Sequence, residues 1–485
     1  MPKRNQVVVG IDLGTQGVRI IAVSSDGDVL AKASIALPIQ REGLPDGWHE
    51  QNPEDGWTIV CQALRRVIRD LPDGISVAGL AVDSTSGSLV VVDGDGSPLY
   101  PSILYNDNRS SKEAAIASKA CPELEESLGY SISSSFALPK IMWLQLEQPQ
   151  LFQKAVHFLS ATDFIIGRLT GEYGVSDYNN ALKTGYDVLH LEWPGVIESG
   201  LGIPISKLPR VVSPGSFITK THGKSCETAG LPAGIPVYAG ATDGTAAQYA
   251  SGAVTPGAWN STLGTTLVFK GITENLCLDP YKRIYCHRHP EGWWMPGGAS
   301  NTGAEWIGVE FPNVDLAGLD QAAVGYFPTS LIWYPLARKG ERFPFIATEA
   351  LGFFVGHAME GAHRFAAGLE GTALMERLSF ELLESVGTQV IDPIIVTGGA
   401  SRSDIWVQLR ATVLNHKLIR PLNTDTAMGA AILAGSGCWF KSLGYAVKNM
   451  IRMGALVEPN QEFVGAYEDK YNDFKRLLAE RNYLT

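Results

Sequence analysis

The fold is set by the stretch Val7-Val8-Val9-Gly10-Ile11-Asp12-Leu13-Gly14-Thr15-Gln16-Gly17-Val18-Arg19-Ile20-Ile21-Ala22-Val23. It predicts a strand, a glycine-rich turn and a second strand, and a further turn at 25–28 leads into an apolar segment at 29–36. Together these segments predict an antiparallel β-meander. Walker A loops and dinucleotide-binding folds place a helix directly after their glycines, so the pattern argues against both.

The same pattern occurs again in the second half of the chain. Residues 258–269 repeat the strand, the Gly-Thr turn and the strand, and Leu263-Gly264-Thr265-Thr266 echoes Leu13-Gly14-Thr15-Gln16. The repeat predicts two related α/β halves joined near residue 250. We therefore expect two domains, at residues 1–248 and 249–485.

Helical periodicity separates the predicted strands. Between residues 53 and 70, apolar side chains recur on one face of a helix, and a second amphipathic helix is expected at 404–414. A third helix, at 427–435, consists mostly of small residues. The alternation of strands and helices is typical of an α/β protein.

Composition excludes several classes of protein. Hydrophobic residues make up 45% of the chain and charged residues 18%, which is too apolar for a disordered protein. The net charge of −11 argues against a nucleic-acid-binding face. No run of 18 apolar residues suggests a membrane span, and the apolar run after the basic start at Lys3 and Arg4 is too short for a signal peptide. The scattered cysteines predict reduced thiols, so we expect a cytoplasmic protein.

The two Gly-Thr turns are candidate phosphate-binding elements. Glycines let backbone N–H groups approach an anion closely, and the threonine adds a hydroxyl donor. Asp12, at a strand end beside the first turn, could hold Mg²⁺ directly or through water. Each turn taken alone is also compatible with an ordinary hairpin. Two such turns in one chain favour the hypothesis that they hold a polyphosphate from both sides.

Two further segments could carry chemistry. Gly398 and Gly399 stand where a predicted strand runs into a helix, a junction that can admit a nucleotide but that is also common without a ligand. Asp243 ends the buried segment 237–243 at the start of a helix, whose dipole should keep the carboxylate ionised. Such a group can accept a proton from a hydroxyl that attacks phosphorus. The alternative is a helix-capping aspartate.

Taken in order, these motifs resemble the FGGY family of carbohydrate kinases, within the actin, hexokinase and Hsp70 ATPase superfamily. The similarity extends from Val7 to about Gly435. The resemblance implies two ribonuclease-H-like domains with a cleft between them, closing over ATP and a polyol or ketose. It also implies ATP and Mg²⁺ as cofactors and a monomer or homodimer.

The resemblance assigns roles to individual residues. It implies that Asp243 is the catalytic base, that Asp12 and Asp243 lie at the metal, and that Asp12, Ser86, Tyr105 and Asp243 bind the sugar. The residues implied to bind ATP come from three segments: Gly14, Thr15 and Gln16; Gly264, Thr265 and Thr266; and Gly398, Gly399 and Ser403.

The substrate is indicated by finer patterns. Gly47-Trp48-His49-Glu50-Gln51-Asn52-Pro53 resembles the Trp-x-Glu-Gln-x-Pro element of pentulose kinases. Ser86-Gly87 stands where bacterial xylulokinases of the well-known type carry Met-His, and Tyr105 stands where the family usually has tryptophan. Together with Gly298-Ala299-Ser300-Asn301-Thr302-Gly303, Ser86-Gly87 resembles a cyanobacterial and plant branch associated with D-ribulose.

These patterns predict an ATP-dependent kinase for a terminal hydroxyl of a ketopentose, with D-ribulose ahead of D-xylulose. Alternatives are a kinase for another polyol, such as glycerol or erythritol, and a non-catalytic regulator that binds ATP or sugar.

Overall fold

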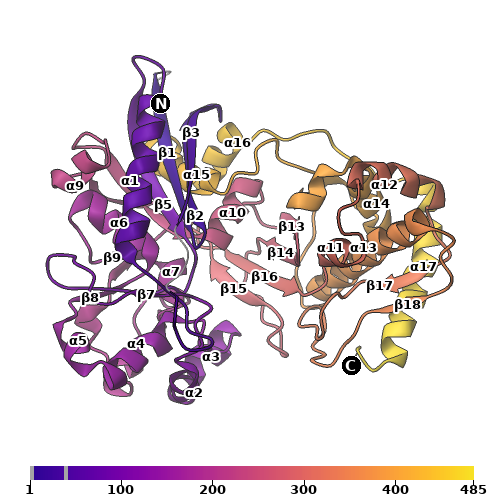
Figure 1. The fold of residues 1–485 in the computed structure, drawn as a ribbon, viewed down its shortest axis with the longest axis horizontal. Coiled ribbons are helices and arrows are strands. Elements are labelled where there is room, and N and C mark those ends of the chain that lie inside the picture. Colours follow the sequence, from indigo (N-terminus) through magenta and orange to yellow (C-terminus); the bar gives the residue numbers. More distant parts are fainter. Residues whose placement is uncertain (1–4, 38–41, 485) are drawn as a thin grey trace. The chain divides into compact units, whose positions relative to one another are not determined.

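The computed structural model describes residues 5–37 and 42–484, so Lys3 and Arg4 of the basic start lie outside the described residues. The chain forms two compact units (Figure 1). Unit 1 comprises Met1–Gly252, His287–Gly292 and Asp425–Arg452, and unit 2 comprises Ala253–Cys286, Trp293–Thr424 and Met453–Thr485. A division at 248/249 does not anticipate that Asp425–Arg452 pack within unit 1, because a return of the chain depends on tertiary contacts.

Unit 1 is built on a six-stranded sheet with the order β11-β12-β5-β1-β2-β3. Strands β1, β2 and β3 are antiparallel neighbours, and β5 and β12 continue the sheet parallel to β1. The bounds are β1 (Gln6–Gly14), β2 (Gly17–Ser24), β3 (Val29–Ala36), β5 (Ser76–Ser84), β11 (Phe217–Lys220) and β12 (Pro236–Thr242).

The sheet of unit 2 has the order β15-β16-β14-β13-β19-β20. Here β13, β14 and β16 are antiparallel neighbours, and β19 and β20 continue the sheet parallel to β13. The bounds are β13 (Trp259–Leu263), β14 (Leu267–Gly271), β15 (Tyr285–Arg288), β16 (Trp294–Ser300), β19 (Ile394–Thr397) and β20 (Leu418–Ile419). In both sheets an antiparallel meander is continued by parallel strands, and in the first sheet β11 is added antiparallel to β12. This shared pattern confirms the predicted α/β fold with two related halves.

Shorter strands pair outside the two main sheets. The pairs are β4 (Glu50–Gln51) with β7 (Ser102–Ile103), β6 (Val90–Val92) with β8 (His157–Leu159), β9 (Val175–Asp177) with β10 (Arg210–Val212), and β17 (Ile332–Tyr334) with β18 (Phe353–Val355).

Helices surround the sheet of each unit. Those of unit 1 are α1 (Pro53–Arg69), α2 (Ser111–Ala120), α3 (Pro122–Leu128), α4 (Ala137–Glu147), α5 (Pro149–Lys154), α6 (Ala161–Thr170), α7 (Tyr178–Leu182), α8 (Val196–Ser199), α9 (Gly223–Thr228), α10 (Asp243–Ser251), α15 (Ala427–Gly435) and α16 (Leu443–Met450). Those of unit 2 are α11 (Glu305–Glu310), α12 (Leu316–Ala323), α13 (Gly361–Ser385), α14 (Asp404–Leu414) and α17 (Gln461–Glu480).

Local sequence explains where α1 begins. Asn52 caps the helix by accepting a hydrogen bond from the backbone N–H of Glu54, and Pro53 occupies the first helical position, where no N–H is needed. The predicted helices at 53–70, 404–414 and 427–435 are confirmed by α1, α14 and α15.

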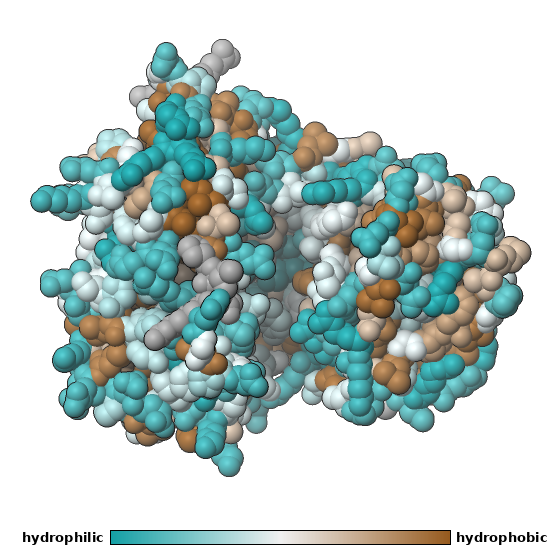
Figure 2. All heavy atoms as spheres, in the orientation of Figure 1, coloured by the Kyte–Doolittle hydropathy of each residue, from teal (hydrophilic) through white to brown (hydrophobic). Residues whose placement is uncertain are grey.

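The face that the molecule presents in Figure 1 is mostly hydrophilic, and its hydrophobic residues form separate small patches (Figure 2). Within residues 5–37 and 42–484, no helix combines the length and the apolar character that crossing a membrane requires.

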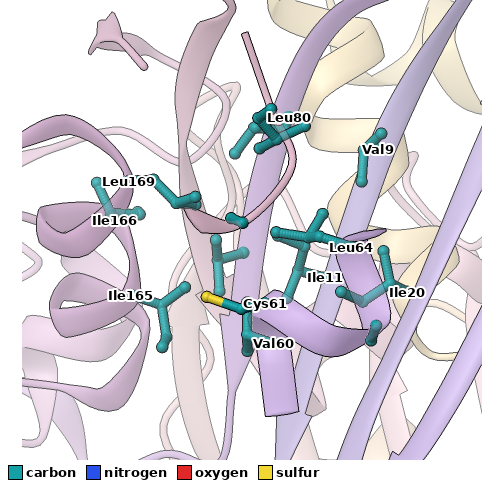
Figure 3. Close-up of a cluster of buried hydrophobic side chains, with 14 of the residues drawn as sticks. Val9, Ile11, Ile20, Val60, Cys61, Leu64, Leu80, Ile165, Ile166 and Leu169 are labelled. Atoms are coloured by element: carbon teal, nitrogen blue, oxygen red, sulfur yellow. The ribbon is translucent and has the colours of Figure 1, made fainter. Parts of the chain in front are cut away.

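The core of unit 1 lies between its sheet and helices α1 and α6. Val9 and Ile11 of β1 point toward Val60 and Leu64 of α1, and Ile165 of α6 closes the cluster from the other side (Figure 3). Because successive strand residues point to opposite faces, the intervening Gly10 faces away from this core.

The opposite face of β1 is covered by α15. A Cβ atom at Gly10 would lie 2.0 Å from the carbonyl oxygen of Ala427, and one at Gly429 would lie 2.1 Å from that of Ala246 in α10. Small residues in α15 therefore allow close packing on both sides. This face also carries Asp12, two residues after Gly10, so α15 begins beside the first candidate site residue.

Candidate functional site

Four carboxyl groups of unit 1 form a group that we call the acidic cluster. Its members are Asp12 at the end of β1, Asp83 near the end of β5, Asp243 after β12 and Asp425 just before α15. Because β1, β5 and β12 are parallel neighbours, their carboxyl ends meet at one edge of the sheet, and the register pairs Asp12 with Asp83. The structure therefore brings together Asp12 and Asp243, which the sequence predicted, and adds two more acids.

Asp12 is buried, with only 4% of its surface exposed. Its Oδ2 accepts a hydrogen bond from the hydroxyl of Thr426, which stands at the start of α15, and Arg19 Nη1 lies 3.4 Å from the same oxygen. Thr426 was not predicted as a site residue, because its contact with Asp12 joins segments 414 residues apart. The only sequence signal was the polar Thr424-Asp425-Thr426 before the small-residue helix.

Asp83 is fully buried, and neither of its carboxylate oxygens accepts a hydrogen bond from the described residues. Burial raises its pKa well above the ordinary value, and the negative charge of Asp12 raises it further. A buried polar group without a donor is costly, so Asp83 marks this edge of the sheet as specialised. Its position directly after the apolar run at 77–82 was the available sequence signal.

Asp243 begins α10 but does not cap it. The side chain of Thr242 accepts the capping hydrogen bond from the N–H of Thr245, and Asp243 Oδ1 accepts one from the N–H of Gly244 at 2.7 Å. The alternative interpretation, a capping aspartate, is thus wrong. Because Thr242 supplies the cap, the carboxylate of Asp243 stands in the first helical turn, where the helix dipole favours its charge.

The acidic cluster offers oxygen ligands, which are the ligands that Mg²⁺ prefers. Among the described residues, no group of three or more His, Cys, Asp or Glu side chains is arranged to hold a metal ion by itself. Mg²⁺ commonly keeps several waters and binds one or two carboxylates together with phosphate oxygens. Asp12 and Asp243 fit that mode of binding.

The first Gly-Thr turn joins β1 to β2 beside the acidic cluster. Gly14 pairs with Gly17, and Gln51 donates a hydrogen bond from Nε2 to the carbonyl oxygen of Thr15 at 2.7 Å. Gly14 and Thr15 are half-buried, whereas Gln16 is exposed. Gly14, Thr15 and Gln51 also line a small cavity of about 50 Å³.

The loop that carries Ser86 is held by a buried lysine. Lys140 Nζ donates to the carbonyl oxygens of Gly87 at 3.1 Å, Ser134 at 2.7 Å and Phe136 at 3.0 Å. Gly87 has φ +79°, and a Cβ atom there would lie 2.2 Å from the carbonyl oxygen of Ser135. Burial lowers the pKa of the Lys140 ammonium to about 7. Lys140 was missed because a single helical lysine gives no sign of burial.

Tyr105 lies next to this loop, and 43% of its surface is exposed. The nearby Arg109 is buried between the rings of Trp48 and Trp143, at 3.8 and 5.0 Å from their centroids. Its guanidinium binds both oxygens of Asp107 and Glu50 Oε1, at 2.7 to 2.8 Å. Arg109 thereby joins the motif at 47–53 to the segment that carries Tyr105.

In unit 2, the second Gly-Thr turn lies beside the glycine pair. Gly398 has φ +89°, and a Cβ atom there would lie 2.4 Å from the carbonyl oxygen of Leu263, the residue before the turn. Thr262 and Thr397 join β13 to β19 through their hydroxyls, 2.8 Å apart. A Cβ atom at Gly264 or Gly399 would meet no atom within 4 Å, so both positions are open to a ligand.

Ser403 follows a short 3-10 helix, Gly399–Arg402, which begins at the second glycine of the pair. Its Oγ caps α14 by accepting a hydrogen bond from the N–H of Trp406 at 3.0 Å. The hypothesis that both turns hold one polyphosphate stays a prediction.

The chain is similar to known proteins over nearly its whole length. Residues 7–250 match the N-terminal domain, and residues 259–438 the C-terminal domain, of the FGGY family of carbohydrate kinases. A xylulose kinase of Bacillus subtilis (strain 168) is 29% identical over 97% of this chain and 96% of that protein, and a gluconokinase of the same organism is 27% identical over 88% and 86%. The crystal structure of a xylulose kinase from Rhodospirillum rubrum, 26% identical, covers 98% of both chains with a TM-score of 0.86.

Proposed function

Since the chain belongs to the FGGY family of carbohydrate kinases and is an ATP-dependent sugar kinase, we propose that its acceptor is a terminal hydroxyl of a ketopentose, with D-ribulose ahead of D-xylulose. The observation that carries this proposal is the fixed loop at 85–88, which lies beside Tyr105 and close in sequence to the acid Asp83. The chain belongs to a family of enzymes, which argues against a non-catalytic regulator.

Asp243 acts as the general base in this proposal. Its carboxylate takes the proton of the sugar hydroxyl while the hydroxyl oxygen bonds to the γ-phosphorus of ATP. The bond between that phosphorus and the bridging oxygen breaks, and ADP leaves with the electron pair. Thr242 already satisfies the helix terminus, so the carboxylate has no capping duty that competes with this role.

Asp12 and Asp243 would hold Mg²⁺, which neutralises charge on the phosphates of bound ATP. The hydrogen bond from Thr426 to Asp12 Oδ2 fixes the direction of that carboxylate. Backbone N–H groups at Gly14–Gln16 and Gly264–Thr266 bind phosphate oxygens, while Gly398 allows the close approach of the Leu263 backbone and Gly399 leaves room for the nucleotide.

Ser86 and Gly87 favour a ketopentose with a hydroxyl near this loop. Ser86 supplies one small hydroxyl, and Gly87 cannot carry a side chain because of the nearby Ser135 carbonyl. D-ribulose and D-xylulose differ only in the configuration of one hydroxyl, which a small polar group can distinguish by hydrogen bonding. D-xylulose remains the second candidate, because relatives named xylulose kinase match nearly the whole chain.

The proposal is tested by ADP release from ATP and Mg²⁺ with a panel of D-ribulose, D-xylulose, ribitol, glycerol, erythritol and gluconate, against a control without acceptor. We expect D-ribulose to give the highest kcat/KM. The Ser86→Ala variant should lower the ratio of kcat/KM for D-ribulose to kcat/KM for D-xylulose. The control Ser111→Ala, at an exposed serine, should leave this ratio unchanged. A higher kcat/KM for D-xylulose would reverse the order, and a preference for a non-pentulose would overturn the proposal.

A further inference from the structure

Glu341 is a buried carboxylate of unit 2 with an unusual number of donors. Only 2% of its surface is exposed. Its Oε1 accepts from the N–H groups of Asn301 at 2.7 Å and Arg342 at 2.9 Å, and its Oε2 accepts from Ser300 Oγ at 2.9 Å, Thr302 N at 3.3 Å, Thr302 Oγ1 at 2.8 Å and the Tyr334 hydroxyl at 3.1 Å. Most of these donors belong to one short segment, Ser300–Thr302.

That segment lies against the second Gly-Thr turn. Ser300 pairs with Leu267, the residue directly after the turn, across strands β16 and β14. A Cβ atom at Gly303 would lie 2.4 Å from the carbonyl oxygen of Thr265, and the N–H of Ala304 donates to the carbonyl oxygen of Gly264 at 2.8 Å. The backbone of 303–304 therefore forms the direct support of the turn.

We propose that Glu341 is a positioning residue for nucleotide binding: it holds Ser300–Thr302, and through Gly303 and Ala304 it fixes the conformation of Gly264–Thr266. This inference rests on the proposed role of the turn in binding ATP. A buried carboxylate is costly unless several donors compensate it, and a network with every member satisfied makes its segment rigid. The motif 298–303 thereby acquires a physical role.

The arrangement requires a carboxylate rather than an amide. Each oxygen of Glu341 accepts from at least two donors. In Glu341→Gln, the amide NH₂ would face a backbone N–H in either orientation, that of Thr302 or those of Asn301 and Arg342. At least one N–H therefore loses its hydrogen bond to residue 341, while the volume of that side chain is nearly unchanged.

A matched control exists in the same unit. Glu370 is fully buried, and its Oε1 accepts from the N–H of Thr329 at 2.9 Å and the Tyr467 hydroxyl at 2.8 Å. Its Oε2 accepts from Thr329 Oγ1 at 2.6 Å and pairs with Lys470. Glu370→Gln thus disturbs a buried network of the same kind that does not contact the turn.

The experiment measures Mg·ADP binding to the full chain by calorimetry, without sugar, together with the KM for ATP and for the sugar. We expect Glu341→Gln to weaken ADP binding and raise the KM for ATP by about tenfold, the effect of about 1.4 kcal/mol, with the sugar KM changed less than about twofold. Glu370→Gln should lower the melting temperature and leave both nucleotide constants unchanged.

If Glu341→Gln does not fold, Thr302→Val, which removes one donor, provides the same test at smaller amplitude. Normal ADP binding by a folded Glu341→Gln or Thr302→Val variant, or an equal loss in Glu370→Gln, would overturn the inference. Failure of the wild-type chain to bind Mg·ADP would instead overturn the proposed nucleotide role of the turn.

Discussion

Replacement of Asp243 by asparagine tests the catalytic role of this carboxylate while leaving the fold intact. Asparagine keeps the shape of the side chain and an Oδ1 atom that can accept from the N–H of Gly244, and Thr242 continues to cap α10. The structural cost is limited to the charge at the helix N-terminus, about 0.3–1 kcal/mol. The loss of a general base lowers turnover by about 10²- to 10⁴-fold. We therefore expect Asp243→Asn to melt close to wild type and to lose nearly all sugar-dependent ADP release.

The assay compares kcat, Mg·ATP binding and melting temperature. Glu462→Gln serves as the control, because Glu462 lies exposed in the first turn of α17, which Asn460 caps. It loses the same kind of dipole interaction at a position far from the acidic cluster in sequence. Turnover of Asp243→Asn within about threefold of wild type, in a folded variant that binds ATP, would refute the assignment of the base.

Three further perturbations follow from the contacts of unit 1. Thr426→Val removes the hydrogen bond to Asp12, which is worth about 1.5–3 kcal/mol for a charged acceptor, so kcat/KM should fall at least about tenfold. Thr426→Ser keeps the hydroxyl and should keep the activity. Equal activity of the two variants would contradict this role of Thr426. Lys140→Met removes the hydrogen bond to the Gly87 carbonyl, so the KM for the sugar should rise while the KM for ATP stays unchanged. An unaltered KM for the sugar would contradict the proposed role of this loop in sugar binding. Burial raises the pKa of Asp163 to about 7, so its protonation stabilises the fold fully below about pH 4 and the effect is lost as the pH rises through about 7. Between about pH 5 and 8, the unfolding free energy should decline by about 2–3 kcal/mol less in Asp163→Asn than in the wild type. Parallel curves of unfolding free energy against pH for the two proteins would exclude the raised pKa of Asp163.

The sequence predicted those parts of the fold that depend on local patterns. The meander at 7–36 follows from alternating apolar residues and glycine turns, and α1 follows from its helical periodicity and from Pro53. The repeat of the Gly-Thr hairpin predicted two related sheets, because two segments with the same pattern of strand, turn and strand form the same kind of antiparallel pair.

Contacts between distant segments could not be predicted in the same way. The return of Asp425–Arg452 to unit 1, the bond between Thr426 and Asp12, and the burial of Lys140 and Glu341 all depend on tertiary packing. The choice of Thr242 over Asp243 as the helix cap was equally undetermined, since both residue types cap helices well.

The central claim is that the chain transfers the γ-phosphoryl group of ATP to a terminal hydroxyl of a ketopentose. Phosphorus NMR of a reaction with ATP, Mg²⁺ and D-ribulose tests it most directly, because it separates a sugar phosphomonoester from inorganic phosphate. We predict one equivalent of terminal phosphomonoester for each ADP formed. Inorganic phosphate as the sole product, with both D-ribulose and D-xylulose left unmodified, would contradict the account.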